Sequence, residues 1–306
     1  QHQRPIAQLL DGLNQLGADV HSVNGFIPCT VKGPIRAGSC TVEGKDSQPV
    51  SALLIAASLL DGKTTIHVKN PGEKPWVDLT LSWLTRLGVS IHRNEYSCFE
   101  VIGQSSYAPF HYIVPADWSS VMYPLAIALM TASDITIQGV DYFDPQGDKL
   151  VITILEQMGA RFVKNENERT LSIQGPQSLT NIDIDINDTI DAISLFAVIG
   201  TFAEGTMRIY NGSNARSKEC DRIFCIVREL KKMGAVIEER PDGLIVQKSS
   251  LTGTSVECYE DHRMALSLAC AAVIAEGITD IQGITCIHKS YPYFFDMIKS
   301  LGGTVL

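Results

Sequence analysis

The chain has 306 residues, a formal net charge of -9 and 45% hydrophobic residues, and its mean hydropathy is +0.08. These values are typical of a globular protein with one or two large cores. The acidic balance argues against a general nucleic-acid binder, which needs many cations facing phosphates. The longest strongly apolar run, ALSLACAAVIA, is too short to span a membrane, and the first residues do not have the layout of a signal peptide.

Five amphipathic helix ends recur along the chain, and each closes with Leu-Gly or Met-Gly before a predicted strand. Their sequences are LLDGLNQLGADV, LSWLTRLGVSI, ILEQMGARF, RELKKMGAVI and DMIKSLGGTVL. The closing glycines are Gly17, Gly88, Gly159, Gly234 and Gly302, which lie 71, 71, 75 and 68 residues apart. Glycine is the expected residue just past a helix, because the backbone turns left-handed there. The spacing predicts a repeated structural unit.

A second series of helices, rich in alanine and apolar on nearly every side, alternates with the first. It comprises SALLIAASLLDGKTTIHV, YPLAIALMTASDITIQGV, ISLFAVIGTFAEGTMRIY and ALSLACAAVIAEGITDIQG, each of which continues through a tight turn into an alternating strand. Helices of this kind must be buried on most sides. We therefore predict an α/β (α+β) fold of repeated βαβαββ units, of which about four and a half are present. Because the first unit has only its second helix and last strands, we expect a further segment upstream.

Polar residues gather at two equivalent points of successive units. The segments before the buried helices are DSQ, DWSS, NDTIDA and EDHRMA, and those before the second helices are GEKPWVD, DPQGDK, NARSKECDR and IHKSYP. Helix capping is the simplest role for the Asp, Asn and Ser residues taken singly. The second group carries the cations Lys74, Lys149, Arg216, Lys218, Arg222 and Lys289. Since helix N-termini also attract anions, we predict a pocket for phosphate groups.

The carboxylates among these cations have two possible roles. Asp191 and Glu219 are either ion-pair partners or proton carriers, and the residues alone leave both roles open. The seven histidines show no metal-ligand spacing, so no metal site is predicted. The eight cysteines are scattered without a CxxC pair, which favours a reducing, cytoplasmic location.

Six segments resemble motifs of the 5-enolpyruvylshikimate-3-phosphate synthases, and they occur along the chain in the same order as in that family. NARSKECDR resembles the Asn-x-Arg-x-Lys-Glu-x-Asp-Arg motif, YEDHRMALSLA the Asp-His-Arg-Met-Ala segment, and HKSYPYFF the Lys-(Ser/Thr)-(Tyr/Phe)-Pro segment. RPIAQLLDGLNQLGA, DSQPVSALLIAA and DTIDAISLFA resemble three helices of the family. The resemblance runs from Arg4 to the C-terminus.

The resemblance implies the inverse α/β barrel of enolpyruvyl transferases, with three βαβαββ units in each of two domains and the substrate cleft between them. Residues 1–115 would be the remainder of an incomplete first domain, and residues 116–306 the second. About 100 residues of the family's N-terminal part would be absent, judged from the repeat spacing. The isolated chain would then be inactive unless that part were supplied, for instance as a separate piece.

The reaction implied is transfer of the enolpyruvyl (1-carboxyvinyl) group of phosphoenolpyruvate to the 5-hydroxyl of shikimate 3-phosphate, with release of phosphate and without metal or cofactor. It belongs to chorismate and aromatic amino acid biosynthesis. By motif, Asp191 would take the hydroxyl proton and Glu219 would exchange a proton with the methylene carbon. The phosphoenolpyruvate-binding residues would be Arg4, Gln48, Arg222, Arg263 and Lys289. Those for shikimate 3-phosphate would be Ser47, Gln48, Asp191, Asn214 and Lys218.

Supporting roles follow for three further residues of these motifs. Arg216 would be an ion-pair partner, Asp221 would orient a helix, and His262 would support the site without reacting. No role in nucleic-acid or membrane binding is implied for any of them.

Among the positions that depart from the family pattern, three make substrate contact doubtful. Asp46 and Glu73 stand where the family has serines, and Trp76 stands where it has tyrosine. Two alternatives stay open: an enolpyruvyl transferase acting on a UDP-amino sugar, which would match the motif at Lys218 and Glu219 poorly, and a non-catalytic anion-binding fragment.

Overall fold

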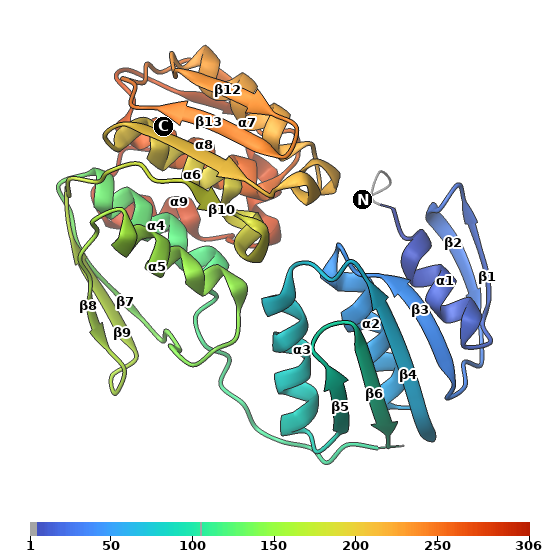
Figure 1. Cartoon of the computed structure of the whole chain (residues 1–306). Helices are drawn as coiled ribbons and strands as arrows, with labels where there is room; N and C mark the ends of the chain where they lie inside the picture. The colour runs from blue at the N-terminus through green and yellow to red at the C-terminus, as the bar shows by residue number, and fades with distance from the viewer. Residues whose placement is uncertain (1–4, 105) are drawn as a thin grey trace. The chain divides into compact units, whose positions relative to one another are not determined.

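The computed structural model describes residues 5–104 and 106–306. The chain divides into two compact units, one comprising residues up to Val114 with Asp144–Gly147, the other Pro115–Phe143 with Asp148–Leu306 (Figure 1). We call them unit 1 and unit 2 and describe each by itself. No helix among the described residues is long and apolar enough to cross a membrane.

Unit 1 contains a two-stranded and a four-stranded sheet with three helices. Its elements are α1 (Ala7–Gln15), β1 (Asp19–Val23), β2 (Phe26–Lys32), β3 (Ser39–Glu43), α2 (Ser47–Ser58), β4 (Gly62–Lys69), α3 (Lys74–Arg86), β5 (Ser90–Asn94) and β6 (Cys98–Gly103). The four-stranded sheet has the order β3-β4-β6-β5. β3 and β4 are parallel and the other neighbours are antiparallel. Leu53 and Leu54 of α2 pack with Ile66 and Phe99 of the sheet to form its core.

Unit 2 contains three more helix-and-sheet assemblies. Its elements are α4 (Trp118–Met130), β7 (Asp134–Gln138), the 3₁₀ turn η1 (Gly147–Lys149), which bridges the two units, α5 (Leu150–Gln157), β8 (Val163–Asn165), β9 (Thr170–Gln174), β10 (Ile184–Asp185), η2 (Asn187–Ala192), α6 (Ile193–Phe202), β11 (Thr206–Tyr210), η3 (Ser213–Ser217), α7 (Arg222–Lys232), β12 (Ile237–Arg240), β13 (Gly243–Gln247), β14 (Ser255–Glu257), α8 (His262–Ile274), β15 (Asp280–Gln282), η4 (Ile284–Lys289) and α9 (Phe294–Ser300).

The predicted βαβαββ repeat is confirmed by matching sheet topologies. The sheet β10-β11-β13-β12 has the same strand order as β3-β4-β6-β5, with the first pair parallel and the rest antiparallel. A third sheet, β7-β9-β8, has the same antiparallel part. The five repeat glycines all have φ between 85° and 105°, the left-handed region where a side chain would be strained. The 71-residue spacing in the sequence therefore marks a true structural repeat.

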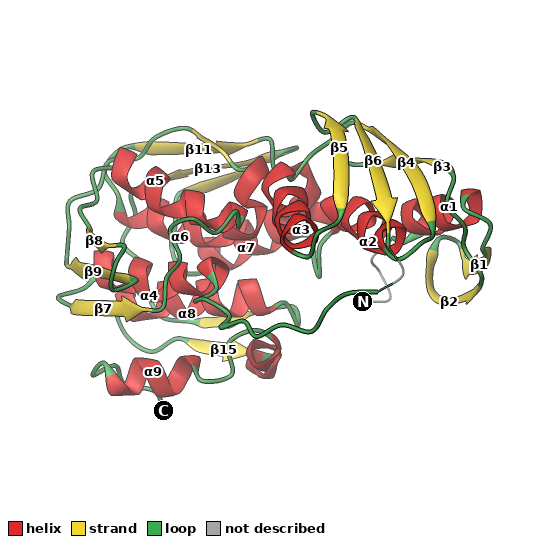
Figure 2. Ribbon diagram, turned by 90° about the horizontal axis from the view of Figure 1, so that it is seen from below, coloured by secondary structure: helices red, strands yellow, loops and turns green. Residues whose placement is uncertain are grey.

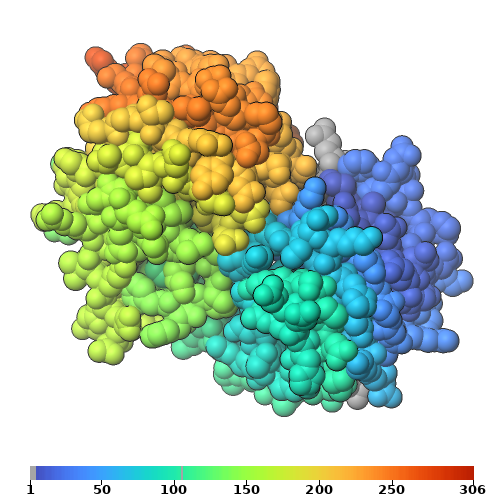
Figure 3. Space-filling view, in the orientation of Figure 1, coloured from blue at the N-terminus to red at the C-terminus, as the bar shows by residue number. Residues whose placement is uncertain are grey.

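The Ala-rich helices α4, α6 and α8 form the interior of unit 2. Every residue of α4 except Ser120 is buried, as are nearly all of those in α6. The three helices contact one another in pairs, and the sheets containing β7, β9, β11 and β13 lie outside them (Figure 2). The space-filling view accordingly shows green segments around β7–β9 and orange segments around β12 and β13 at the surface of unit 2 (Figure 3). Helices that are apolar all round thus find apolar partners on every side.

Candidate active site

The starts of several helices meet at one place in unit 2. Asp117 caps α4 by accepting from the Ser119 N–H, and Asp261 caps α8 by accepting from the Arg263 N–H. Asp221 caps α7 in the same way through Phe224 N–H. These aspartates satisfy N–H groups that a helix leaves unpaired at its first turn. Capping therefore holds the starts of these helices in defined positions, and the charged side chains come with them.

Arg222 is the centre of the charge cluster. Its Nε lies 2.7 Å from Asp261 Oδ2, its Nη1 2.6 Å from Asp191 Oδ1, and its Nη2 2.9 Å from Glu219 Oε2. A further bond from Nη2 reaches Asp261 Oδ1 at 3.3 Å. These contacts use four of the five guanidinium N–H groups, and only 1% of Arg222 is exposed. In this structure Arg222 therefore orients three carboxylates and has at most one N–H for a ligand.

Arg263 approaches Asp191 from α8. Its Nη1 and Nη2 donate to Ser119 O and Oγ, each at 2.7 Å, and Nη2 lies 3.3 Å from Asp191 Oδ2. Each oxygen of Asp191 thus has its own arginine, one from α7 and one from α8. The two arginines hold the Asp191 carboxylate in place, and because its side chain is 24% exposed it is still accessible to a ligand.

Glu219 joins two cations at the edge of the same cluster. One of its oxygens accepts from Arg222 and the other from Lys289 Nζ at 2.5 Å. Lys289 lies at the end of η4, and 46% of its side chain is exposed. Arg222, Arg263 and Lys289 balance Asp191, Glu219 and Asp261 in charge. Lys289 is the most exposed of these three cations and therefore the one most available to an incoming anion.

Both candidate proton carriers, Asp191 and Glu219, are ionised at neutral pH. Burial acts to raise the pKa of Asp191, but the charges of Arg222, Arg263 and Lys218 overcome it and hold that pKa well below its usual range. For Glu219 burial is likewise overcome, by Arg222 and Lys289, and the pKa falls to about 2. Burial and the neighbouring Arg263 charge lower the pKa of His262 to about 4, so this imidazole is neutral. Asp191 and Glu219 can therefore accept protons.

The remaining predicted residues of unit 2 lie on η3, directly after it and on η1. Asn214 is half-buried within η3, and Lys218 is the first residue after η3. Lys218 is close enough for its charge to act on Asp191. Arg216 pairs with Asp221 and Glu239 at 2.7 and 2.9 Å, which confirms the structural role predicted for it. Lys149, grouped with the site cations in the sequence, donates to the Tyr142 carbonyl at 2.8 Å.

The predicted residues of unit 1 form a separate group at the start of α2. Ser47 donates through N and Oγ to Glu73 Oε2, at 3.2 and 3.0 Å, and Asp46 accepts from Gln48 N at 2.9 Å. The N–H groups that would bind an anion here are thus already bonded to carboxylates of the chain. Glu73 is 2% exposed, and Trp76 lies one turn further on, half-buried. Arg4 lies outside the described residues.

Four residues at the site were not named as candidates from the sequence: Ser119, Asp148, Thr189 and Asp261. Asp261 and Ser119 were visible only as helix caps within EDHRMA and DWSS. Their role as partners of Arg222 and Arg263 depends on packing across 39 and 144 residues. Only the repeat offered a signal, because it places these segments at equivalent points.

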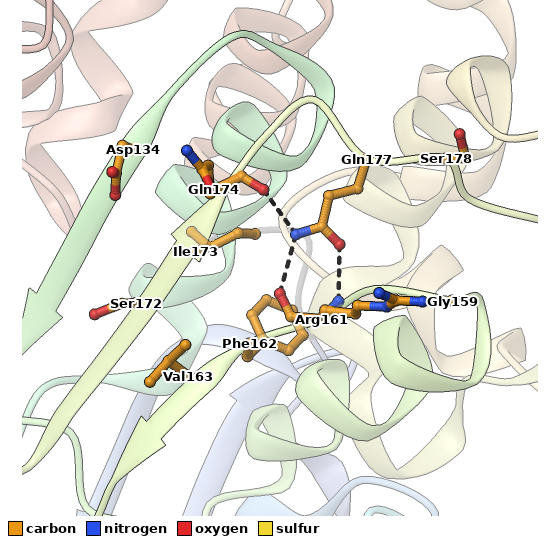
Figure 4. A pocket seen from close by; sticks show the side chains of 10 residues that line it. All are labelled: Asp134, Gly159, Arg161, Phe162, Val163, Ser172, Ile173, Gln174, Gln177 and Ser178. Carbon is orange, nitrogen blue, oxygen red and sulfur yellow. Dashed lines mark hydrogen bonds between the residues drawn. The ribbon is translucent and has the colours of Figure 1, made fainter.

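The pocket drawn in Figure 4 is not this site. It has a volume of about 620 Å³ and is lined by Asp134, Gly159, Arg161, Phe162, Val163, Ser172, Ile173, Gln174, Gln177 and Ser178, none of them a predicted site residue. Gln177 crosses it and bonds the backbone of Arg161 and Gln174, which is a structural role. Within the described residues no three His, Cys, Asp or Glu side chains are arranged to hold a metal ion.

The contact between Lys289 and Glu219 predicts a pH-dependent contribution to stability. Because the folded-state pKa of Glu219 is depressed to about 2, its contribution is present above the unfolded value near 4 and lost as pH falls through about 2. Lys289→Met should lower the free energy of unfolding by about 0.5–1 kcal/mol at neutral pH, since solvent screens a half-exposed lysine. Urea unfolding at a series of pH values measures this.

The difference between the Lys289→Met variant and the unmodified chain should shrink toward about pH 2, where Glu219 becomes protonated. Lys299→Met serves as the control, because Lys299 is an exposed lysine of α9 in the same unit. It should leave stability within about 0.5 kcal/mol at every pH. A loss in Lys289→Met that persists undiminished at the acid end contradicts the electrostatic account.

Comparison with known proteins supports the family resemblance. The family model described as EPSP synthase (3-phosphoshikimate 1-carboxyvinyltransferase) matches residues 2–298. A 3-phosphoshikimate 1-carboxyvinyltransferase of Methanococcus aeolicus is 38% identical over 312 residues, covering 99% of this chain and 72% of that protein. The enzyme of the same name from Chlamydia trachomatis serovar D is also 38% identical, covering 99% of this chain and 69% of its own length.

A solved structure supports the fold independently. An EPSP synthase from Acinetobacter baumannii matches with a TM-score of 0.79 and 23% identity, over 99% of this chain and 72% of that one. The family match covers the site cluster as well as the repeated units, since Asp191, Glu219, Arg222, Arg263 and Lys289 all lie within residues 2–298. The chain belongs to the EPSP synthase (3-phosphoshikimate 1-carboxyvinyltransferase) family.

Proposed function

We propose that unit 2 provides the phosphoenolpyruvate site and both proton-transfer groups of an enzyme that transfers the carboxyvinyl group to the 5-hydroxyl of shikimate 3-phosphate. The observation that carries the proposal is the binding of Asp191 and Glu219 to one buried guanidinium, 2.6 and 2.9 Å away. The reaction needs cations for an anionic donor and two carboxylates for two proton transfers. Arg222, Arg263 and Lys289 provide the first, and Asp191 and Glu219 the second.

The proton transfers balance as an addition followed by an elimination. Asp191 accepts the proton of the 5-hydroxyl as its oxygen bonds to C2 of phosphoenolpyruvate, and the C2–C3 double bond takes up a proton at C3. The bond from C2 to the phosphate oxygen then breaks, and phosphate leaves. A proton lost from C3 restores the double bond, which completes the enolpyruvyl ether. Glu219 is the group assigned to the proton that C3 gains and loses.

Glu219 must gain a proton before it can donate one, and binding of the donor supplies the reason. Lys289 helps lower the pKa of Glu219 to about 2. A phosphoenolpyruvate phosphate that recruits the exposed Lys289 ammonium withdraws that cation and adds negative charge nearby. Both changes raise the pKa of Glu219, so donor binding prepares the carboxyl group for proton exchange with C3.

The acceptor contacts rest on the family motifs and on position. We assign Asn214 and Lys218 to shikimate 3-phosphate. The charge of Lys218 acts on Asp191, and Asn214 belongs to η3, which packs against the η2 segment that carries Asp191. Ser47 and Gln48 are assigned to the same substrate, and Gln48 and Arg4 also to phosphoenolpyruvate. For Ser47 to bind a phosphate it must first release Glu73, which now accepts its hydroxyl proton at 3.0 Å. Asp46 and Glu73 therefore have no assigned substrate contact, and neither has Trp76.

Location and partners complete the proposal. All eight cysteines are free thiols, which is consistent with a cytoplasmic enzyme. The part of the relatives that this chain does not match is proposed as a contributor to the acceptor site, if necessary as a separate polypeptide. The UDP-amino sugar alternative is disfavoured by the family match, whereas a non-catalytic anion-binding role is an outcome of the test below.

The test measures phosphate release from phosphoenolpyruvate with shikimate 3-phosphate, and deuterium uptake at C3 in D₂O by NMR. Two samples are measured, the chain alone and the chain with the unmatched part of the relatives added as a second polypeptide. We expect both signals in at least the second sample. Glu219→Gln should lower deuterium uptake and kcat by about 10²–10⁴-fold, since the amide cannot carry the proton. Glu239→Gln is the matched control, because Glu239 pairs with Arg216 and lies outside the cluster.

Either of two results overturns the proposal. One is phosphoenolpyruvate binding with no phosphate release in either sample, which would establish the non-catalytic role. The other is full deuterium uptake in Glu219→Gln, which would leave the reaction in place but assign the C3 proton to another group.

A further inference from the structure

Asp148 is a carboxyl group buried next to the proposed base, and the mechanism above does not use it. It lies in η1, just before α5, and has no exposed surface. Its Oδ1 accepts from Thr189 Oγ1 at 2.8 Å, while Oδ2 is buried and has no hydrogen-bond partner among the described residues. A carboxylate with a single donor is poorly stabilised away from water, so the neutral acid costs less.

Thr189 marks a break in the segment that presents Asp191. η2 runs from Asn187 to Ala192, but Thr189 has φ -136° and ψ 50°, outside helical geometry. The side chain of Thr189 is 1% exposed, and its hydroxyl has Asp148 as its acceptor. The kink precedes Asp191 by two residues, so the bond to Asp148 helps determine the direction of the Asp191 side chain.

Charged groups on three neighbouring segments act on Asp148. Asp191 on η2 and Asp117 at the start of α4 are negative, and Arg263 on α8 is positive. Burial, reinforced by Asp191, raises the pKa of Asp148 to about 7. Ionised Asp148 would place a second negative charge near Asp191 and attract Arg263, whose Nε is buried without a partner among the described residues. Protonated Asp148 leaves Arg263 to Asp191.

We propose that Asp148 is a positioning residue that acts in its protonated form, accepting the Thr189 hydroxyl to hold the kink that directs Asp191 at the acceptor. The inference rests on the proposed function, because it is Asp191's role as a base that gives the kink a purpose. Asp148 does not touch the substrate. It acts on Asp191 through the hydrogen bond from Thr189. Because its protonated form carries no charge, it also leaves Arg263 paired with Asp191.

The substitutions that test this separate the hydrogen bond from the charge. Thr189→Val removes the hydroxyl, and we expect kcat to fall about 10–100-fold while KM for phosphoenolpyruvate changes less than about threefold. Thr189→Ser restores the hydroxyl and should restore kcat. Asp148→Asn keeps an acceptor oxygen but cannot ionise, so it should retain kcat near about pH 6 and lose the decline in activity that begins near about pH 7.

Stability gives a second readout that needs no substrate. The folded-state pKa of Asp148, about 7, exceeds the unfolded value near 3.9, so the folded state binds a proton that the unfolded state releases as pH rises between them. Stability is therefore lost over that interval. Asp148→Asn should be more stable than the unmodified chain by about 3–5 °C in Tm at about pH 8, with a smaller gap at about pH 5. Asp134 is an exposed aspartate of unit 2, and the control variant Asp134→Asn should leave Tm unchanged at both pH values.

The outcomes distinguish this inference from the function on which it rests. If the complete enzyme releases no phosphate, the proposed function fails and the positioning role falls with it. If the enzyme is active but Thr189→Val keeps full kcat, or Asp148→Asn keeps the alkaline decline, only the present inference is overturned. A lower Tm for Asp148→Asn at about pH 8 also overturns it, because that result means that the ionised carboxylate stabilises the fold.

Discussion

Replacing Asp191 by asparagine is expected to lower kcat by about 10²–10⁴-fold, the usual contribution of a positioned general base. Asparagine preserves the shape and can still accept from Arg222 Nη1, now 2.6 Å from Asp191 Oδ1. What it cannot do is take the proton of the 5-hydroxyl. The loss should therefore appear in kcat, and the geometry of the cluster should survive.

Affinity for phosphoenolpyruvate should not fall in Asp191→Asn. Removing one of three carboxylates leaves the arginines with excess positive charge, which favours an incoming anion. We expect KM for phosphoenolpyruvate to stay level or decrease, measured by steady-state kinetics and by direct binding. Asp183→Asn is the matched control, because Asp183 is an exposed aspartate eight residues before Asp191. This variant should leave kcat and KM unchanged. A variant that loses affinity but keeps kcat would show that Asp191 binds and does not act as the base.

Repeated features were predictable from the sequence, because they depend on neighbours in the chain. Gly159 and Gly234 marked helix ends, and both have positive φ. The apolar segments around Leu125 and Phe196 were predicted to be buried helices, and both residues have no exposed surface. Local chemistry of this kind needs only a periodic pattern and a terminating glycine.

The membership of the charge cluster was predictable in part. The motifs assigned Asp191, Glu219 and Arg222 to one site, and in the structure the Arg222 guanidinium donates to both Asp191 and Glu219. The fully buried partner, Asp261, was not predicted, because a helix cap and an ion-pair partner have the same appearance in a sequence. Only packing of α7 against the start of α8 gives its carboxylate both functions.

The start of α2 has a contact that the sequence did not indicate. An anion site at Ser47 was a reasonable expectation, since Ser47 opens a helix whose N–H groups face outward. In the structure the carboxylate of Glu73 lies 3.0 Å from the Ser47 hydroxyl, and Ser47 stays a predicted substrate contact. The two residues are 26 positions apart, and Glu73 adopts a left-handed conformation with φ 45° to reach this position. No local pattern contains that information.

Replacing Arg222 by methionine is expected to cost about 3–5 kcal/mol of unfolding free energy and to abolish turnover. Methionine fills part of the volume but leaves three carboxylates without their common cation. The loss is greatest for Asp261, because its carboxylate has no exposed surface. Without Arg222 it would keep no cation as a hydrogen-bond donor, only the backbone N–H of Arg263 and the Cys220 thiol. Urea unfolding, followed by circular dichroism, measures the loss.

The pH dependence identifies the cause of that loss. Arg222 is among the groups that hold the pKa values of Asp191 and Glu219 below their usual range. Carboxylates with depressed folded-state pKa values contribute stability above the unfolded value near 4 and lose it as pH falls further. The gap between Arg222→Met and the unmodified chain should therefore be largest near neutral pH and should narrow in acid. A packing defect alone would leave a constant gap.

Two further variants decide between charge and volume. Arg216→Met removes an arginine whose partners, Asp221 and Glu239, are 35% and 39% exposed, so it should cost only about 1–2 kcal/mol. Adding Asp261→Asn to Arg222→Met removes the buried unpaired charge while keeping a helix cap, and should recover part of the lost stability. If the double variant is no more stable than Arg222→Met, the unpaired carboxylate is not the cause. If it recovers stability without recovering turnover, Arg222 is required both to hold the fold of unit 2 and to keep Asp191 and Glu219 in place for the reaction.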